Sequence, residues 1–132
     1  LVRSRGLGDV YKRQIYYDKW RENVIEWFQY LQDNRSFVLN IFNSQNRSYL
    51  LRYFKGRLHY CVHSFAAICA EGKNIEWSDL EFVCEFYVNA AIGWISQWFD
   101  MGMPQLDDHD RERYIKILDG STENLLARFQ KD

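Results

Sequence analysis

The stretch FYVNAAIGWISQWFDMGMP, residues 86–104, decides the fold of this chain. Its apolar residues recur at helical rather than alternating spacing, which indicates a helix with a broad buried face. The stretch then reaches Gly102, which readily adopts the left-handed conformation, and Pro104, which cannot continue a helix. We therefore expect a long helix that ends at Met101.

The start of this helix carries its own signals. Ser78 and Glu81 have the spacing of a capping box, in which each side chain satisfies a backbone N–H of the first turn. Trp77 and Phe82 have the spacing of a hydrophobic staple across the same turn. The pattern predicts a helix that begins with Ser78 as its cap.

Helical spacing continues through most of the chain. There is one proline in 132 residues and no alternating run between hairpin turns, so we expect an all-α domain. The pattern predicts a bundle of five helices: residues 18–33, a short helix after Ser36, a third from Asn46 or Ser48 to near Gly72, a fourth ending at Met101, and a fifth capped by Asp107 or Asp108 and interrupted by Gly120.

The fourth helix has more apolar surface than polar surface. Glu85, Asn89, Ser96 and Asp100 fall on one narrow stripe, and apolar residues fill the wide remaining arc. The arc fits either a central helix covered by its own bundle or a helix that also meets a second copy of the chain. On the second interpretation, the interface residues are Phe86, Ala90, Gly93, Trp94, Gln97, Tyr114, Leu118, Leu125 and Phe129.

The third helix is basic. No acidic residue occurs between Asn34 and Ala70, and helical spacing places Arg52, Lys55, His59 and His63 on one side. The face is either a solvated surface or a recognition surface for an anionic effector or an acidic partner.

Sites for catalysis, metals and cofactors are not indicated. His59 and His63 are four residues apart, but the sequence HYCVH lacks the glutamate of a zinc-protease helix. There is no glycine-rich phosphate loop and no nucleophile elbow. We expect no catalytic residues, no metal, no cofactor and no enzymatic activity.

Charge and cysteine content restrict the class of protein. The formal net charge is −1, and without residues 1–14 the chain has 13 basic and 17 acidic residues, so direct binding to nucleic acid is not expected. The chain has three cysteines, Cys61, Cys69 and Cys84, which lie in apolar helical patterns. We expect them to be free thiols in the reducing cytoplasm and not a disulfide framework. No apolar stretch is long enough to span a membrane.

The first fourteen residues, LVRSRGLGDVYKRQ, have no apolar periodicity. Asp9 to Gln14 can be encoded by GAT GTG TAT AAG AGA CAG, which resembles the transposon mosaic end used in sequencing libraries. We expect residues 1–14 to be a non-native segment that replaces native sequence upstream, and residues 15–132 to form the domain.

Two stretches carry a family resemblance. WRENVIEWFQYLQDNRSFVLNIFN, residues 20–43, precedes the long third helix, and residues 86–104 end in the pattern W-x-x-x-G-M. Together they resemble the C-terminal ligand-binding and dimerisation domain of TetR/AcrR-type transcriptional regulators, most like the subgroup common in Firmicutes. The resemblance runs from Trp20 to Phe129.

The resemblance implies a cytoplasmic homodimer that senses a small molecule and binds DNA only through an N-terminal helix-turn-helix domain, here missing. The last two helices of each copy would form an intermolecular four-helix bundle. A stand-alone adaptor that binds an acidic protein through the basic third helix is the alternative. The resemblance implies that the first, third and fourth helices surround the effector. There we expect aromatic walls from Trp27, Phe28 and Trp98 and polar selection by His59, Tyr60 and His63.

Overall fold

The computed structural model describes the backbone of residues 2–118 and 120–132 and the side chains of residues 15, 18–117 and 120–132. Within these ranges all the regular structure is helical, which confirms the predicted all-α fold class. The helices in chain order are α1 (Val2–Asp33), α2 (Arg35–Phe42), α3 (Arg47–Cys69), α4 (Trp77–Asp100), α5 (Asp108–Leu118) and α6 (Ser121–Ala127).

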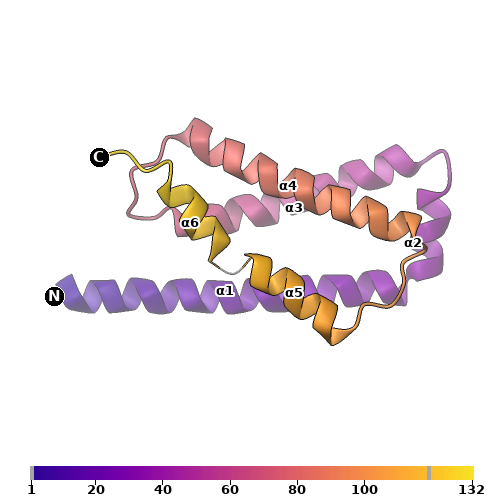
Figure 1. Ribbon diagram of the computed structural model, residues 1–132, viewed down its shortest axis with the longest axis horizontal. Coiled ribbons are helices and arrows are strands. Elements are labelled where there is room, and N and C mark those ends of the chain that lie inside the picture. Colours follow the sequence, from indigo (N-terminus) through magenta and orange to yellow (C-terminus); the bar gives the residue numbers. More distant parts are fainter. Residues whose placement is uncertain (1, 119) are drawn as a thin grey trace.

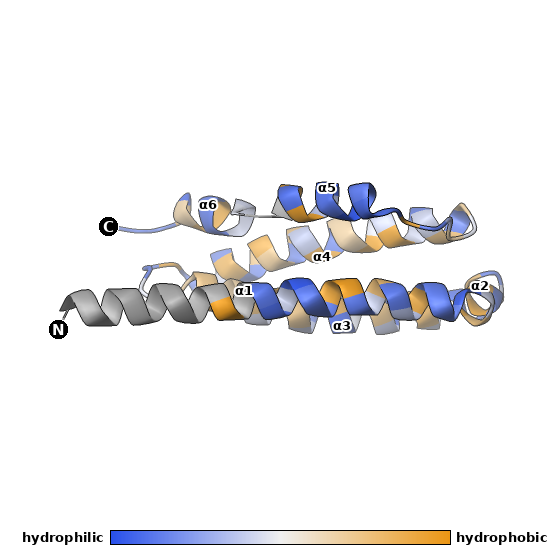
Figure 2. Ribbon diagram, turned by 90° about the horizontal axis from the view of Figure 1, so that it is seen from below, coloured by the Kyte–Doolittle hydropathy of each residue, from blue (hydrophilic) through white to orange (hydrophobic). Residues whose placement is uncertain are grey.

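The helices lie in three levels. Figure 2 shows α1 and α3 beside each other at one level, α4 above them, and α5 and α6 on the far side of α4. In Figure 1 the short α5 and α6 pass in front of the space between α1 and α4. The most extensive contact between helices is that of α3 with α4. The hydropathy colouring shows that α5 is strongly hydrophilic, whereas α4 is mostly apolar (Figure 2).

Two groups of buried side chains hold these levels together, and α4 contributes to both. The larger group lies where α1, α2, α3 and α4 meet, and the smaller lies where α3, α4 and α6 meet. The first contains Leu31, Val38, Phe42, Phe54, Ile95, Trp98, Phe99, Met103 and Leu106. The second contains Ala66, Cys69, Leu80, Val83, Cys84 and Leu126.

The first helix begins earlier than predicted. Its backbone is helical from Val2, so the expected start near residue 18 was wrong. Extending an existing helix is much easier than nucleating one, because each added residue gains a hydrogen bond. Apolar periodicity reports burial rather than helicity and therefore missed this part. The side chains of residues 1–14 lie outside the described residues, and the non-native origin of this segment stays a prediction.

The start of α4 also differs from the prediction. The cap is Glu76, whose carbonyl accepts hydrogen bonds from the N–H groups of Asp79 and Leu80, and no side chain caps the helix. The capping box of Ser78 was therefore wrong, because Glu81 is engaged by a histidine of α3 instead. Trp77 lies against that histidine and is, like Phe82, largely exposed.

The later helix boundaries follow the sequence signals. Gly102 has φ of +84°, as expected for the residue that ends α4. Asp107 caps α5, because its carboxylate accepts a hydrogen bond of 2.7 Å from the N–H of Asp110. The expected fifth helix is two helices, since Gly120 has φ of +72° and α6 begins after it. The expected count of five is thus corrected to six within the described residues.

Phe99 provides a test of this core. Its side chain is 1% exposed and lies against the rings of Phe42 and Phe54, at centroid distances of 5.1 and 5.8 Å. We expect Phe99→Ala to lower the free energy of unfolding by about 3–5 kcal/mol in urea denaturation followed by circular dichroism. Phe37→Ala, at a site that is 67% exposed, should change it by less than about 0.5 kcal/mol. Equal effects of the two substitutions would show that Phe99 is not a core residue.

Candidate functional site

Aromatic side chains from α1, α4 and α5 meet at the centre of the domain. Phe28 of α1 has its ring edge-on to Trp94 and Trp98 of α4, at 5.3 and 5.8 Å. Trp94 also meets Tyr114 of α5 at 4.5 Å. The Trp98 ring is fixed, because its Nε1–H donates a hydrogen bond of 2.9 Å to the carbonyl of Pro104. Edge-on ring pairs of this kind add specific geometry to the burial of apolar surface.

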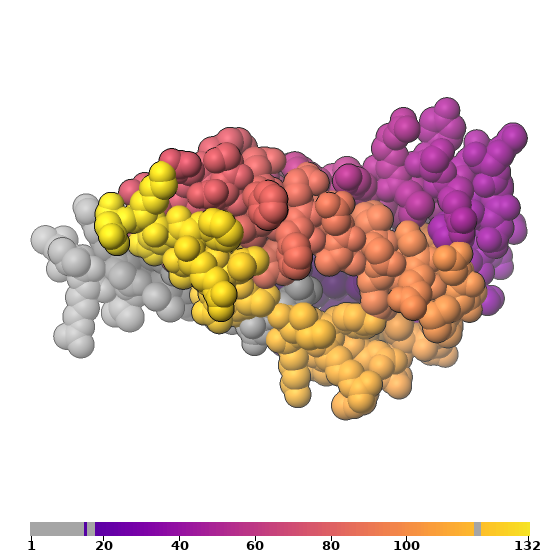
Figure 3. Space-filling view, turned by 45° about the horizontal axis from the view of Figure 1, so that its top comes forward, coloured from indigo at the N-terminus to yellow at the C-terminus, as the bar shows by residue number. Residues whose placement is uncertain are grey.

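Helix α5 is attached mainly by side chains, because its backbone comes close to α1 and α4 in few places. Arg21 of α1 forms an ion pair of 2.9 Å with Glu112, and Arg111 donates a hydrogen bond of 3.2 Å to Gln32. The buried Nε of Arg111 has no hydrogen-bond partner among the described residues. Figure 3 shows the surface hollowed between α4 and the α5–α6 segment, with α1 behind.

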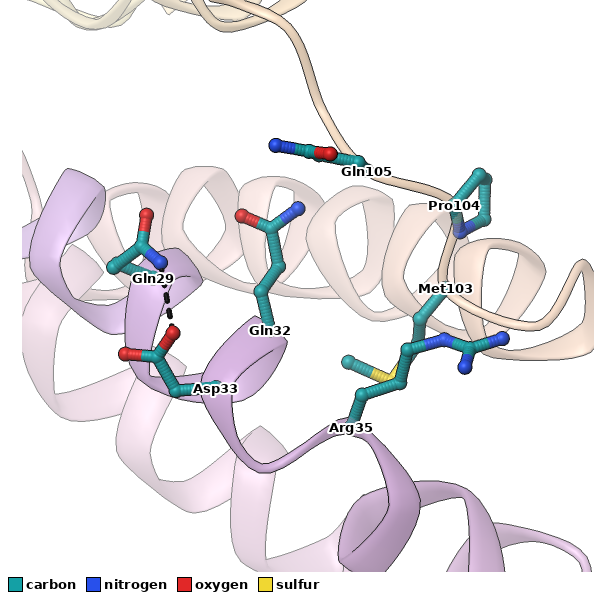
Figure 4. A pocket seen from close by; sticks show the side chains of 7 residues that line it. All are labelled: Gln29, Gln32, Asp33, Arg35, Met103, Pro104 and Gln105. Atoms are coloured by element: carbon teal, nitrogen blue, oxygen red, sulfur yellow. Dashed lines mark hydrogen bonds between the residues drawn. The ribbon is translucent and has the colours of Figure 1, made fainter.

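A second hollow lies at the corner between α1 and α2. This pocket has a volume of about 470 Å³, and Figure 4 shows its polar lining. The guanidinium of Arg35 is held at its edge, because Nε donates a hydrogen bond of 2.8 Å to the carbonyl of Gly102. The side chains that line it are Gln29, Gln32, Asp33, Arg35, Met103, Pro104 and Gln105, none of which was predicted to bind an effector.

The predicted effector-binding residues divide into two separate groups. Trp27, Phe28 and Trp98 belong to the larger core and its margin. The other three are His59, Tyr60 and His63 of α3. The two histidines lie beside α4, and Tyr60 faces solvent. Tyr60 is 73% exposed. The structure therefore does not bring all six residues together around one pocket.

The two histidines of α3 contact carboxylates of α4. His63 Nε2 is 2.6 Å from Glu81 Oε1, and His59 Nε2 is 3.3 Å from Glu85 Oε1. All four side chains are partly exposed, so these contacts join the two helices through a hydrated surface. Over the described residues, no group of three or more His, Cys, Asp or Glu side chains is arranged to hold a metal ion.

Four of the predicted dimer residues form an exposed row along α4. Phe86, Ala90, Gly93 and Gln97 are all exposed and repeat at helical spacing. Phe82 extends the row by one turn and is 71% exposed, and Phe86 is 61% exposed. We call these five residues the α4 stripe. Phe82 was missed as part of it because the sequence pattern assigned it to a local contact with Trp77.

The remaining predicted dimer residues make contacts within their own chain or lie outside the described residues. Trp94 and Tyr114 contact each other within the chain, and Leu125 and Phe129 pack against the smaller core group. The side chain of Leu118 lies outside the described residues. The stripe and the aromatic centre thus lie on neighbouring sides of α4, and the consecutive residues Gly93 and Trp94 belong to one each.

The three cysteines have different environments. Cys61 is exposed, whereas Cys69 and Cys84 are buried, and all three are free thiols. Burial, reinforced by the neighbouring carboxylates of Glu81 and Glu85, raises the pKa of the Cys84 thiol to about 11. Burial and Asp110 also raise the pKa of the Tyr114 hydroxyl, which therefore stays neutral at physiological pH.

Comparison with known proteins identifies the domain. A family model for the C-terminal region of TetR-type transcriptional regulators matches residues 18–120. This chain belongs to that family. No curated protein and no solved structure matches it. None of the described helices has the length and apolar character that crossing a bilayer requires. The TetR-type family is a family of regulators rather than of enzymes.

Thiol reactivity tests the packing of α3 and α4 in this TetR-type domain. A thiolate is the reactive form, so the exposed Cys61 should react quickly with a thiol reagent at about pH 8, and Cys84 should stay protected. We expect one fast thiol in the folded protein and three in urea, with the fast phase absent in Cys61→Ser. Fast reaction of Cys84 in the folded state would show that α4 is not packed as described.

Proposed function

We propose that this TetR-type domain joins two regulator chains as a homodimer and senses a small molecule in the cytoplasm. The α4 stripe is the observation that supports dimerisation most directly. A monomer rarely leaves two phenylalanines exposed in register on one helix, because contiguous apolar surface in water is unfavourable. In each copy, α4 would supply one helix of the intermolecular four-helix bundle, and α5 with α6, which together replace the single expected fifth helix, would supply the other.

The residues of the stripe suit close pairing about a two-fold axis. Phe82 and Phe86 supply apolar area, and Ala90 and Gly93 are small enough to let two helices approach closely. A side chain built at Gly93 would meet nothing within 4 Å in its own chain. The protomer therefore leaves open space at this position, into which the helix of a second copy would fit.

Gly93→Arg tests the dimer. The substitution should leave the helical content and thermal midpoint of the protomer nearly unchanged and should convert the dimer to a monomer in sedimentation velocity at micromolar concentration. Gly56→Arg is the matched control, because Gly56 is also helical and a side chain there likewise meets nothing within 4 Å. A monomeric unmodified chain, or a Gly93→Arg chain that stays dimeric, contradicts the proposal.

The effector site is best supported where α5 meets the aromatic centre. Trp94 contacts the rings of both Phe28 and Tyr114 where α1, α4 and α5 meet, and Tyr114 adds a neutral hydroxyl to this aromatic surface. Apolar walls with a few fixed polar groups are typical of small-molecule sites. Trp27 and Trp98 would support these walls from the core. His59, Tyr60 and His63 are the competing prediction, on α3.

Ligand binding distinguishes these two locations. We would screen small aromatic compounds and metabolites by thermal shift and measure the hits by calorimetry. We expect Tyr114→Ala to lower the affinity for these compounds at least tenfold, because it removes an aromatic ring and its hydroxyl from the proposed site. Tyr30→Ala, at a site that is 63% exposed, should not change them. Hits that weaken with His59→Ala and His63→Ala, and not with Tyr114→Ala, would place the effector against α3.

A further inference from the structure

The outer side of α3 presents a row of exposed tyrosines. Tyr49, Tyr53 and Tyr60 are 64%, 63% and 73% exposed and fall on one side of the helix, away from the buried Phe54. Gly56 lies among them, and a side chain there would meet nothing within 4 Å. From Tyr49 to Tyr60 the row spans about 16 Å, or three turns of helix.

Basic side chains flank this row without acidic neighbours. The segment from Asn34 to Ala70 has five Arg and Lys residues and no Asp or Glu. Two of the five are used within the fold, because Arg35 bonds to the carbonyl of Gly102 and Arg47 pairs with Asp100 at 2.8 Å. In the described part of the chain, no carboxylate forms an ion pair with the remaining cations, which are Arg52, Lys55 and Arg57.

We define the α3 outer face as Tyr49, Arg52, Tyr53, Gly56, Arg57 and Tyr60. Arg52 lies over the ring of Tyr49, with its guanidinium carbon 5.8 Å from the ring centroid, so the aromatic and basic groups form one continuous surface. Tyrosine and arginine are the residues most enriched at the energetic centres of protein interfaces. Neither residue type is needed for folding at positions this exposed.

The charge pattern favours a protein ligand over nucleic acid. Arg52 and Arg57 could neutralise only about two phosphates, whereas proteins that bind DNA neutralise many more. The chain as a whole has a formal net charge of −1, which also disfavours DNA. Two guanidinium groups beside tyrosine rings instead suit a few carboxylates beside an apolar surface, because each guanidinium can bind a carboxylate through two hydrogen bonds.

We infer that the α3 outer face is a docking surface for a partner protein that presents an acidic amphipathic helix. The apolar side of that helix would lie along the tyrosine row. The two helix backbones would come closest at Gly56, which has no side chain. Its glutamate or aspartate side chains would bind Arg52 and Arg57. The surface is separate from the α4 stripe and from the aromatic centre, so this inference does not depend on dimerisation or on effector binding.

A designed peptide provides the probe. A fluorescent peptide of about five helical turns would have leucines along one side and glutamates elsewhere, and a scrambled peptide of the same composition would lack the leucine side. We expect the first peptide to bind the full chain with micromolar affinity by fluorescence anisotropy, and the scrambled peptide to bind at least tenfold more weakly.

Two pairs of variants locate the binding surface. Arg52→Glu with Arg57→Glu should weaken binding at least tenfold, whereas Lys19→Glu with Lys116→Glu changes the total charge equally, at exposed sites on α1 and α5, and should not. Tyr53→Ala should weaken binding severalfold, whereas Tyr30→Ala, at a site of equal exposure, should not. Circular dichroism would verify that each variant is folded.

Three results would overturn the inference. The first is equal binding of the amphipathic and scrambled peptides, which would show attraction by charge alone. The second is equal loss in the two charge-reversal variants. The third is displacement of the peptide by a short DNA duplex with higher affinity than the peptide itself, which would assign the face to nucleic acid.

Discussion

The packing of α4 against α3 is the interaction on which the rest of the fold depends. Cys84 of α4 is fully buried in one group with Ala66 and Cys69 of α3, and α4 reaches both groups of core residues. The end of α4 packs Phe99 against Phe42 of α2, so the position of α2 follows from that of α4. Its beginning packs with Leu126 of α6. Helix α5 makes the fewest backbone approaches and is placed by side chains instead.

The apolar surface of α4 is wider than the area that its neighbouring helices in the same chain cover. The inner side is satisfied by α3 and by the aromatic contacts of Trp94, and the α4 stripe is left over. Gly93 of the stripe and Trp94 of the aromatic centre are consecutive residues. A ligand that moved Tyr114 would therefore act on Trp94, and a rotation of α4 would be transmitted to the proposed dimer contact without any intermediate element. In the function that we propose, this short path would couple sensing to the arrangement of two chains.

Sequence patterns predicted those parts of the fold that depend on local chemistry. The end of α4 at Gly102 and the capping of α5 by Asp107 are decided by the residues themselves, and both were confirmed. The cap of α4 was wrong because Glu81 has a better partner in His63, eighteen positions away in sequence. The sequence pattern also could not show that Trp94 contacts Tyr114 of its own chain and not a second copy. Periodicity gives the angle of a residue around its helix, but the identity of the neighbour at that angle depends on tertiary packing.

The two exposed helix surfaces differ in what they can bind. The α4 stripe is uncharged, so two copies can face each other across a two-fold axis without electrostatic cost. Pairing the α3 outer face with its own copy would instead bring Arg52 and Arg57 of one chain close to the same cations of the other, and like charges in a desolvated contact repel. Lys55 would add to this repulsion. The chemistry of the α3 outer face therefore suits the acidic partner that we infer, while that of the α4 stripe suits the second copy of the chain that we propose.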